Sequence, residues 1–110
     1  MAFLALASQK SLLNLQKNFL QLQYNSITNQ VQAAESQMAA IKKQNKDVEN
    51  YDEEDDPTYL YYEQLDEQLS SEKDSIDTQM TAIENQISSL KTLVNNNVKS
   101  SCTLNLATGN

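Results

Sequence analysis

The stretch YDEEDDPT, residues 51–58, decides the fold because it contains the only proline of a chain in which glycine occurs once, at position 109. Asp56 followed by Pro57 is typical of a helix start: an aspartate side chain caps the first turn, and a proline at the first helical position loses no hydrogen bond. The neighbouring acidic residues favour the positive end of the dipole of the helix that follows. We therefore expect a turn over about 51–56 and a helix that begins at about 57.

On the N-terminal side of this turn, nothing from residue 3 to about residue 50 breaks a helix. Apolar residues recur there at every seventh position, and a companion series lies three positions earlier. This pattern predicts a coiled-coil helix over about 3–50. The main series is Leu6, Leu13, Leu20, Ile27, Ala34, Ile41 and Val48, and the companion series is Phe3, Lys10, Lys17, Tyr24, Val31, Met38 and Asn45.

On the C-terminal side, a second apolar series predicts a helix over about 57–99. Three consecutive asparagines, residues 95–97, weaken that helix near its end. The tail, residues 100–110, has no helical pattern, and we expect it to be flexible. The second series is Leu65, Leu69, Ile76, Met80, Ile83, Ile87, Leu90, Val94 and Val98.

A turn of about six residues lets the second helix fold back on the first. The fold class predicted is all-α, an antiparallel coiled-coil helical hairpin, with a single domain over 1–99 and a flexible tail. If the turn is centred at residues 53–54, the facing residues form one apolar seam between the helices. The predicted seam pairs are Met38 with Leu69, Val31 with Ile76, Ile27 with Met80, Tyr24 with Ile83, Leu20 with Ile87, and Leu13 with Val94.

The composition excludes most catalytic chemistry. The 110 residues include no histidine and a single cysteine, Cys102, so neither a histidine acid–base pair, a His/Cys zinc site nor an internal disulfide can form. No glycine-rich phosphate loop is present. We expect a protein that is not an enzyme and that needs no cofactor.

Charge and hydropathy limit the partners. Eight lysines oppose fifteen carboxylates, and the net charge of −7 disfavours nucleic acid. No run of roughly 18 apolar residues exists to span a membrane. The opening MAFLALAS lacks the basic segment of a cleaved signal peptide. We therefore expect a cytoplasmic protein, or one exported without a cleaved signal.

The spacing of the acidic residues in the turn fits part of the pattern of a calcium-binding loop. Asp52, Glu54, Asp56 and Glu63 occupy positions 1, 3, 5 and 12 of a calcium-binding EF-hand frame. Position 6 of that frame requires glycine for a sharp turn, and this chain has Pro57 there. The same acidic residues are equally expected in a solvent-exposed loop that is followed by the first turn of a helix. Calcium binding is therefore only a weak candidate.

A second apolar stripe lies on the first helix, on a face roughly opposite the seam. Its residues are spaced 3-4-3, and a helix that is apolar nearly all round is normally buried. Something should therefore cover this partner stripe: a second copy of the chain, or another protein such as a chaperone. Membrane-surface contact is a weaker alternative, since only Lys10 and Lys17 would meet headgroups. The partner stripe is Leu12, Leu15, Phe19 and Leu22, with Leu4.

Residues 49–72, ENYDEEDDPTYLYYEQLDEQLSSE, resemble the turn region of bacterial type III secretion needle subunits. The first third of the chain is also similar to the N-termini of flagellar axial proteins, through Ser8-Gln9, Leu12-Leu13, Leu15 and Asn29-Gln30. It resembles equally a group of small bacterial helical proteins that share this opening and a close like Asn97-Val98-Lys99-Ser100-Ser101. These resemblances imply a bacterial, secretion-related axial or accessory protein, although needle subunits lack a tail after the second helix. The residues that match the needle pattern are Asp55, Asp56, Pro57, Leu60, Gln64 and Leu65.

Two functional hypotheses follow from the partner stripe, and a third, an ion-binding regulator that depends on the loop from Asp52 to Glu63, ranks last. The first is a structural subunit that self-associates through the partner stripe, in a closed assembly or a filament. The second is a small acidic adaptor or chaperone-like module that holds a partner helix on the same stripe. Both hypotheses require the stripe to be exposed in a single chain.

Overall fold

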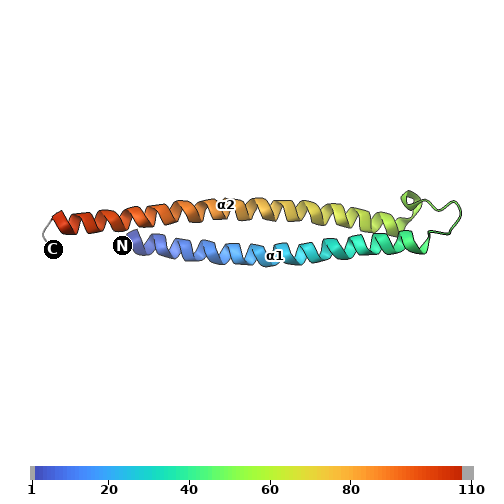
Figure 1. Ribbon diagram of the computed structural model, residues 1–110, viewed down its shortest axis with the longest axis horizontal. Coiled ribbons are helices and arrows are strands. Elements are labelled where there is room, and N and C mark those ends of the chain that lie inside the picture. The colour runs from blue at the N-terminus through green and yellow to red at the C-terminus, as the bar shows by residue number, and fades with distance from the viewer. Residues whose placement is uncertain (1, 108–110) are drawn as a thin grey trace. The chain divides into compact units, whose positions relative to one another are not determined.

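The computed structural model describes the backbone of residues 2–107 and the side chains of residues 4–96. The elements are α1 (Ala2–Gln44), a short 3-10 helix η1 (Glu53–Asp55) and α2 (Pro57–Ala107), and the described residues include no strand. The two long helices pack against each other as an antiparallel pair (Figure 1). The predicted all-α helical hairpin is therefore confirmed.

Backbone packing divides the chain into two compact units. Unit 1 comprises Met1–Gln21 and Thr78–Asn110, and unit 2 is the continuous segment Leu22–Asp77. Each unit contains one part of α1 packed on one part of α2. The prediction of a single domain over 1–99 remains a prediction.

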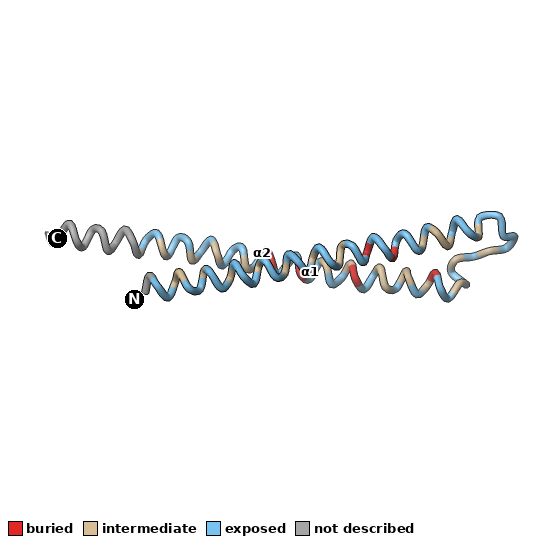
Figure 2. The backbone as a smooth tube through the Cα atoms, turned by 90° about the horizontal axis from the view of Figure 1, so that it is seen from below, coloured by how far each residue is buried: buried red, intermediate tan, exposed pale blue. Residues whose placement is uncertain are grey.

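The core of unit 2 is the seam between the helices. Val31 and Ala34 of α1 are buried, as are Tyr59, Leu69 and Ile76 of α2, and Figure 2 shows buried residues on both helices. Alternating spacings of three and four residues connect these positions through half-buried neighbours, as knobs-into-holes packing requires. Those half-buried neighbours are Tyr24, Ile27, Met38, Ile41, Tyr62, Asp66 and Lys73.

The seam of unit 1 has the same spacing but less burial. Met80 is its only buried residue among the described side chains, and the others are half-buried. Lys10 and Lys17 also lie at half-buried seam positions. All twelve predicted seam residues are thus buried or half-buried, and those half-buried in unit 1 are Leu13, Leu20, Ile83, Ile87 and Val94.

Helix α1 ends at Gln44, about six residues before the expected end. The chain tightens there, because the Lys46 amide donates to the Lys43 carbonyl and the Asn45 side chain donates to the Ile41 carbonyl. Asn50 then takes a left-handed conformation, with φ of 62°. The connection therefore covers residues 45–56 rather than 51–56, and Val48 is exposed instead of packing in the seam.

The earlier end of α1 changes the register of the hairpin. The ammonium of Lys17 contacts Glu84, whereas the predicted register placed Lys17 opposite Leu90. Lys42 lies over Tyr59, whereas the prediction placed it opposite Leu65. The predicted pairs, such as Met38 with Leu69 and Val31 with Ile76, are therefore wrong by about six residues, because the centre of the turn lies about three residues earlier.

Helix α2 begins at Pro57, as expected, and its start is capped by Asp56. The Asp56 Oδ1 atom accepts hydrogen bonds from the amides of Thr58 and Tyr59 at 3.0 and 3.4 Å. At the other end, α2 continues through Ala107 rather than ending near 99. The predicted end of the helix near 99 is wrong, because no glycine or proline lies between Pro57 and Gly109 to end the helix earlier. The flexibility of the tail remains a prediction. Residues 108–110, and the side chains of Phe3, Val98 and Cys102, lie outside the described part.

Candidate partner interface

The predicted partner stripe is exposed. In unit 1, Leu12, Leu15 and Phe19 keep 55, 66 and 61 % of their surface exposed, and Leu4 keeps 64 %. Leu22, which belongs to unit 2, keeps 69 %. These side chains lie away from the seam, so the hairpin leaves them without cover from its own second helix.

Two shallow grooves run beside the stripe in unit 1. The first has a volume of about 520 Å³ and the second about 560 Å³. Both are bordered by stripe residues and reach down to seam residues between the helices. The first is lined by Gln9, Leu12, Leu13, Gln16, Asn85, Gln86, Ser89 and Leu90, and the second by Leu15, Gln16, Phe19, Leu20, Gln79 and Ile83.

These linings contain glutamines that the sequence did not predict as part of the interface. Gln9 and Gln16 come from α1, and Gln79 and Gln86 come from α2. One signal was available: glutamine recurs in α1 at every seventh residue, at 9, 16, 23, 30, 37 and 44. Residues that recur at every seventh position lie on one side of a coiled-coil helix, so these glutamines share one side of α1. Which residues of α2 lie beside them depends on the register of the two helices.

The two units carry very different charge. Unit 1 holds four lysines and one carboxylate, Glu84, for a net of +3; unit 2 holds four lysines and fourteen carboxylates, for a net of −10. In unit 1, the Lys17 Nζ atom lies 3.2 Å from the Glu84 Oε1 atom. Leu4, Leu12, Leu15 and Phe19 of the partner stripe, and both grooves, therefore belong to the unit with few charges.

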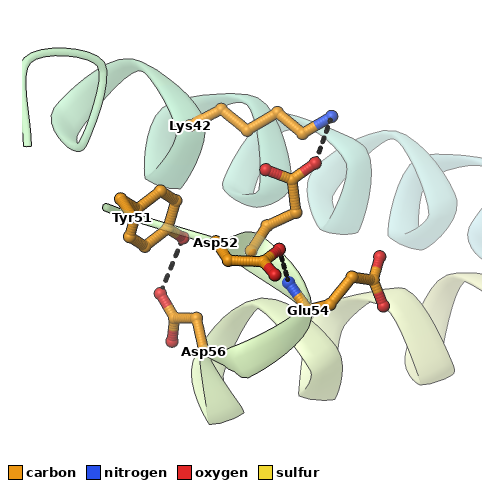
Figure 3. A network of polar contacts seen from close by, with 6 residues as sticks. Lys42, Tyr51, Asp52, Glu54 and Asp56 are labelled. Carbon is orange, nitrogen blue, oxygen red and sulfur yellow. Dashed lines mark hydrogen bonds and ion pairs between the residues drawn. The ribbon is translucent and has the colours of Figure 1, made fainter. Parts of the chain in front are cut away.

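The acidic connection between the helices is held by internal contacts (Figure 3). The Tyr51 hydroxyl donates to the Asp56 Oδ2 atom at 2.8 Å, and the Asp52 Oδ1 atom accepts from the Glu54 amide at 3.0 Å. Lys42 Nζ lies 3.8 Å from the Glu53 Oε1 atom. The carboxylates of Asp52 and Asp56 thus cap the chain locally.

These contacts shift the acid–base equilibria of the connection. Burial and the hydrogen bond to Asp56 raise the pKa of Tyr51 to about 12. The same hydrogen bond, together with the amides of Thr58 and Tyr59, lowers the pKa of Asp56. Repulsion from Glu63 raises the pKa of Glu54. The pKa of Lys42 is raised by its hydrogen bond to Tyr59.

The structure does not gather the candidate calcium residues into a site. Within the described residues, no group of three or more His, Cys, Asp or Glu side chains is placed to hold a metal ion. Two of the four candidates, Asp52 and Asp56, are occupied by backbone amides, and Glu54 and Glu63 repel each other. The connection therefore supplies no support for an ion-binding role.

Comparison with known proteins finds no matching family model, no similar curated protein and no similar solved structure. In the part of the chain that the structure describes, neither helix combines the length and the apolar character needed to cross a membrane.

Proposed function

We propose that this protein is a non-enzymatic structural subunit that self-associates through the part of the partner stripe that lies in unit 1. The observation that carries the proposal is the exposure of Leu12, Leu15 and Phe19, each more than half exposed, in the unit with few charges. The two grooves beside the stripe give a second chain a surface to fill. Self-association buries this surface without requiring any other component.

Burial of the exposed stripe side chains would contribute a large free energy. Full burial of one large apolar side chain contributes about 1.5–3 kcal/mol. Leu4, Leu12, Leu15 and Phe19 are already partly covered, so their remaining burial contributes roughly 4–8 kcal/mol. That is comparable with the net stability of about 5–15 kcal/mol of a whole domain, which supports a role for the stripe in assembly.

The proposal extends to the biological setting through the resemblance of residues 49–72 to type III secretion needle subunits. This resemblance implies an axial or accessory subunit of a bacterial secretion apparatus, and self-association of the hairpin is compatible with an axial role. Electron micrographs of concentrated protein distinguish a filament from a closed assembly.

The test is the mass in solution as a function of concentration. We expect the intact chain to exceed the 12.4 kDa of one copy, and Phe19→Lys to remain a single copy, because a charge then lies in the apolar contact. Tyr61→Lys is the matched control: Tyr61 is 60 % exposed, like Phe19 at 61 %, but lies in unit 2 outside the stripe. It should assemble like the intact chain.

Two results would contradict the proposal. If the intact chain stays a single copy at the highest concentration, self-association fails, and the same stripe is then assigned to a partner helix held by an adaptor. If Tyr61→Lys dissociates the assembly as fully as Phe19→Lys does, the contact does not lie on the stripe.

A further inference from the structure

The two sides of the seam in unit 1 differ in chemistry. On one side lie Gln9 and Gln16 of α1 and Gln79 and Gln86 of α2, and both grooves open there. We call these four residues the glutamine side. Helical geometry places Asn14, Glu84 and Lys91 on the opposite flank of the seam. Among the described residues that line the grooves, none is charged.

The glutamine side is suited to contact with its own copy. A two-fold interface places the same surface on both chains, and residue i of one chain contacts residue j of the other, so the surface must be complementary to itself. A glutamine amide both donates and accepts hydrogen bonds, and apolar side chains pack on one another, whereas like charges repel. Leu12, Phe19 and the four glutamines meet this requirement, whereas on the opposite flank the Glu84 carboxylate is already paired with Lys17 of the same chain.

We propose that a second copy of this chain docks on the glutamine side of unit 1, about a two-fold axis near Gln16, with the two α1 helices antiparallel. This inference rests on the proposed self-association and adds which flank is used and in which orientation. Gln16 borders both grooves, and Leu12 and Phe19 lie at nearly equal sequence distances before and after it. An axis at Gln16 therefore brings Leu12 of each copy towards Phe19 of the other.

Charge selects the antiparallel orientation. In a parallel pair, equal residue numbers lie side by side, including residues 45–56, which hold seven carboxylates and one lysine in each copy. Like charges placed side by side repel. In the antiparallel pair, each copy presents its weakly charged unit 1 to the other.

The test uses single cysteines in a Cys102→Ser background, since Cys102 is the only native cysteine. Gln16→Cys should form a disulfide-linked dimer as the main product under mild oxidation, because the two residues face each other at the axis. Asn14→Cys is the matched control on the opposite flank and should remain unlinked. Gln9→Cys should also remain unlinked, because an antiparallel pair separates the two residues by about 14 positions, or roughly 21 Å along the helix, beyond the reach of a disulfide.

The outcomes separate this inference from the proposed function. A chain that stays a single copy before oxidation overturns both. If the intact chain associates and Asn14→Cys links in preference to Gln16→Cys, self-association stands and the glutamine side is wrong. Efficient linking of Gln9→Cys in the associated protein overturns the antiparallel orientation.

Discussion

At the scale of single residues, Asp66 is the least satisfied member of the seam. It occupies a half-buried seam position of α2 in unit 2, and its Oδ1 atom is buried without a hydrogen-bond partner. An unpaired polar atom costs free energy when it is withdrawn from water. The heptad position is thus occupied by a residue that weakens the seam.

Replacing Asp66 should therefore stabilise the protein. We expect Asp66→Leu to raise the free energy of unfolding by about 1–3 kcal/mol, through removal of the unpaired atom and burial of an apolar side chain. Urea unfolding measures the change. Glu67→Leu is the control, because it removes one negative charge at an exposed neighbouring position and should change stability little. A loss of stability in Asp66→Leu would mean that the carboxylate makes a favourable contact.

At the scale of elements, the end of α1 is the feature that the periodicity did not predict. The apolar series continues formally to Val48, yet the helix ends at Gln44. Asn45 caps the Ile41 carbonyl with its own side chain, and Asn50 adopts a left-handed conformation that asparagine tolerates better than most residues. Local side-chain hydrogen bonds outweigh the last repeat of the heptad pattern, because no residue of α2 covers Val48.

The left-handed conformation of Asn50 gives a test of this connection. Asn50→Val should lower the free energy of unfolding by about 1–2 kcal/mol, because a β-branched residue clashes with the backbone at positive φ. Asn50→Gly should match or exceed the intact chain, because glycine has no such clash. Thermal or urea unfolding distinguishes the two variants. Equal stability of the valine and glycine variants would show that this conformation does not constrain the turn.

At the scale of the whole molecule, charge is divided unevenly between the two units. Unit 2 carries fourteen of the fifteen carboxylates, and unit 1 carries Leu4, Leu12, Leu15 and Phe19 of the partner stripe together with both grooves. An assembly built from contacts between unit 1 and unit 1 is driven by apolar burial and opposed by the overall negative charge. An assembly built head to tail, unit 1 on unit 2, would instead be favoured by opposite charges.

Salt therefore separates the two kinds of assembly. Raising the salt concentration shortens the screening length from about 10 Å at 0.1 M to about 3 Å at 1 M. We expect self-association to strengthen, because the repulsion between negatively charged chains is screened while apolar burial persists. Mass against concentration at low and high sodium chloride measures the effect. Weaker association at high salt would favour a head-to-tail contact between the basic and acidic units.

Much of the candidate site was predictable. The spacing of Leu12, Leu15 and Phe19 placed them away from the seam, and they are exposed in the structure. The glutamine side was not predictable, since Gln79 and Gln86 join Gln9 and Gln16 only when the register of α2 against α1 is known. A single helix shows which residues share its own face, and it does not show which residues of another helix complete that face.

The sequence by itself determined the class of fold, the start of α2 at Pro57 and the residues of the seam, because the heptad spacing and Asp56-Pro57 act locally. Only the tertiary structure decided the register, the end of α1 and the extension of α2 through Ala107. The physical reason is that a heptad pattern repeats every seven residues. If one helix slides along the other by nearly one heptad, each seam residue still lies in the seam. The burial of the seam residues is therefore the same in the predicted and the observed register. The position of the connection, residues 45–56, decides between the two registers.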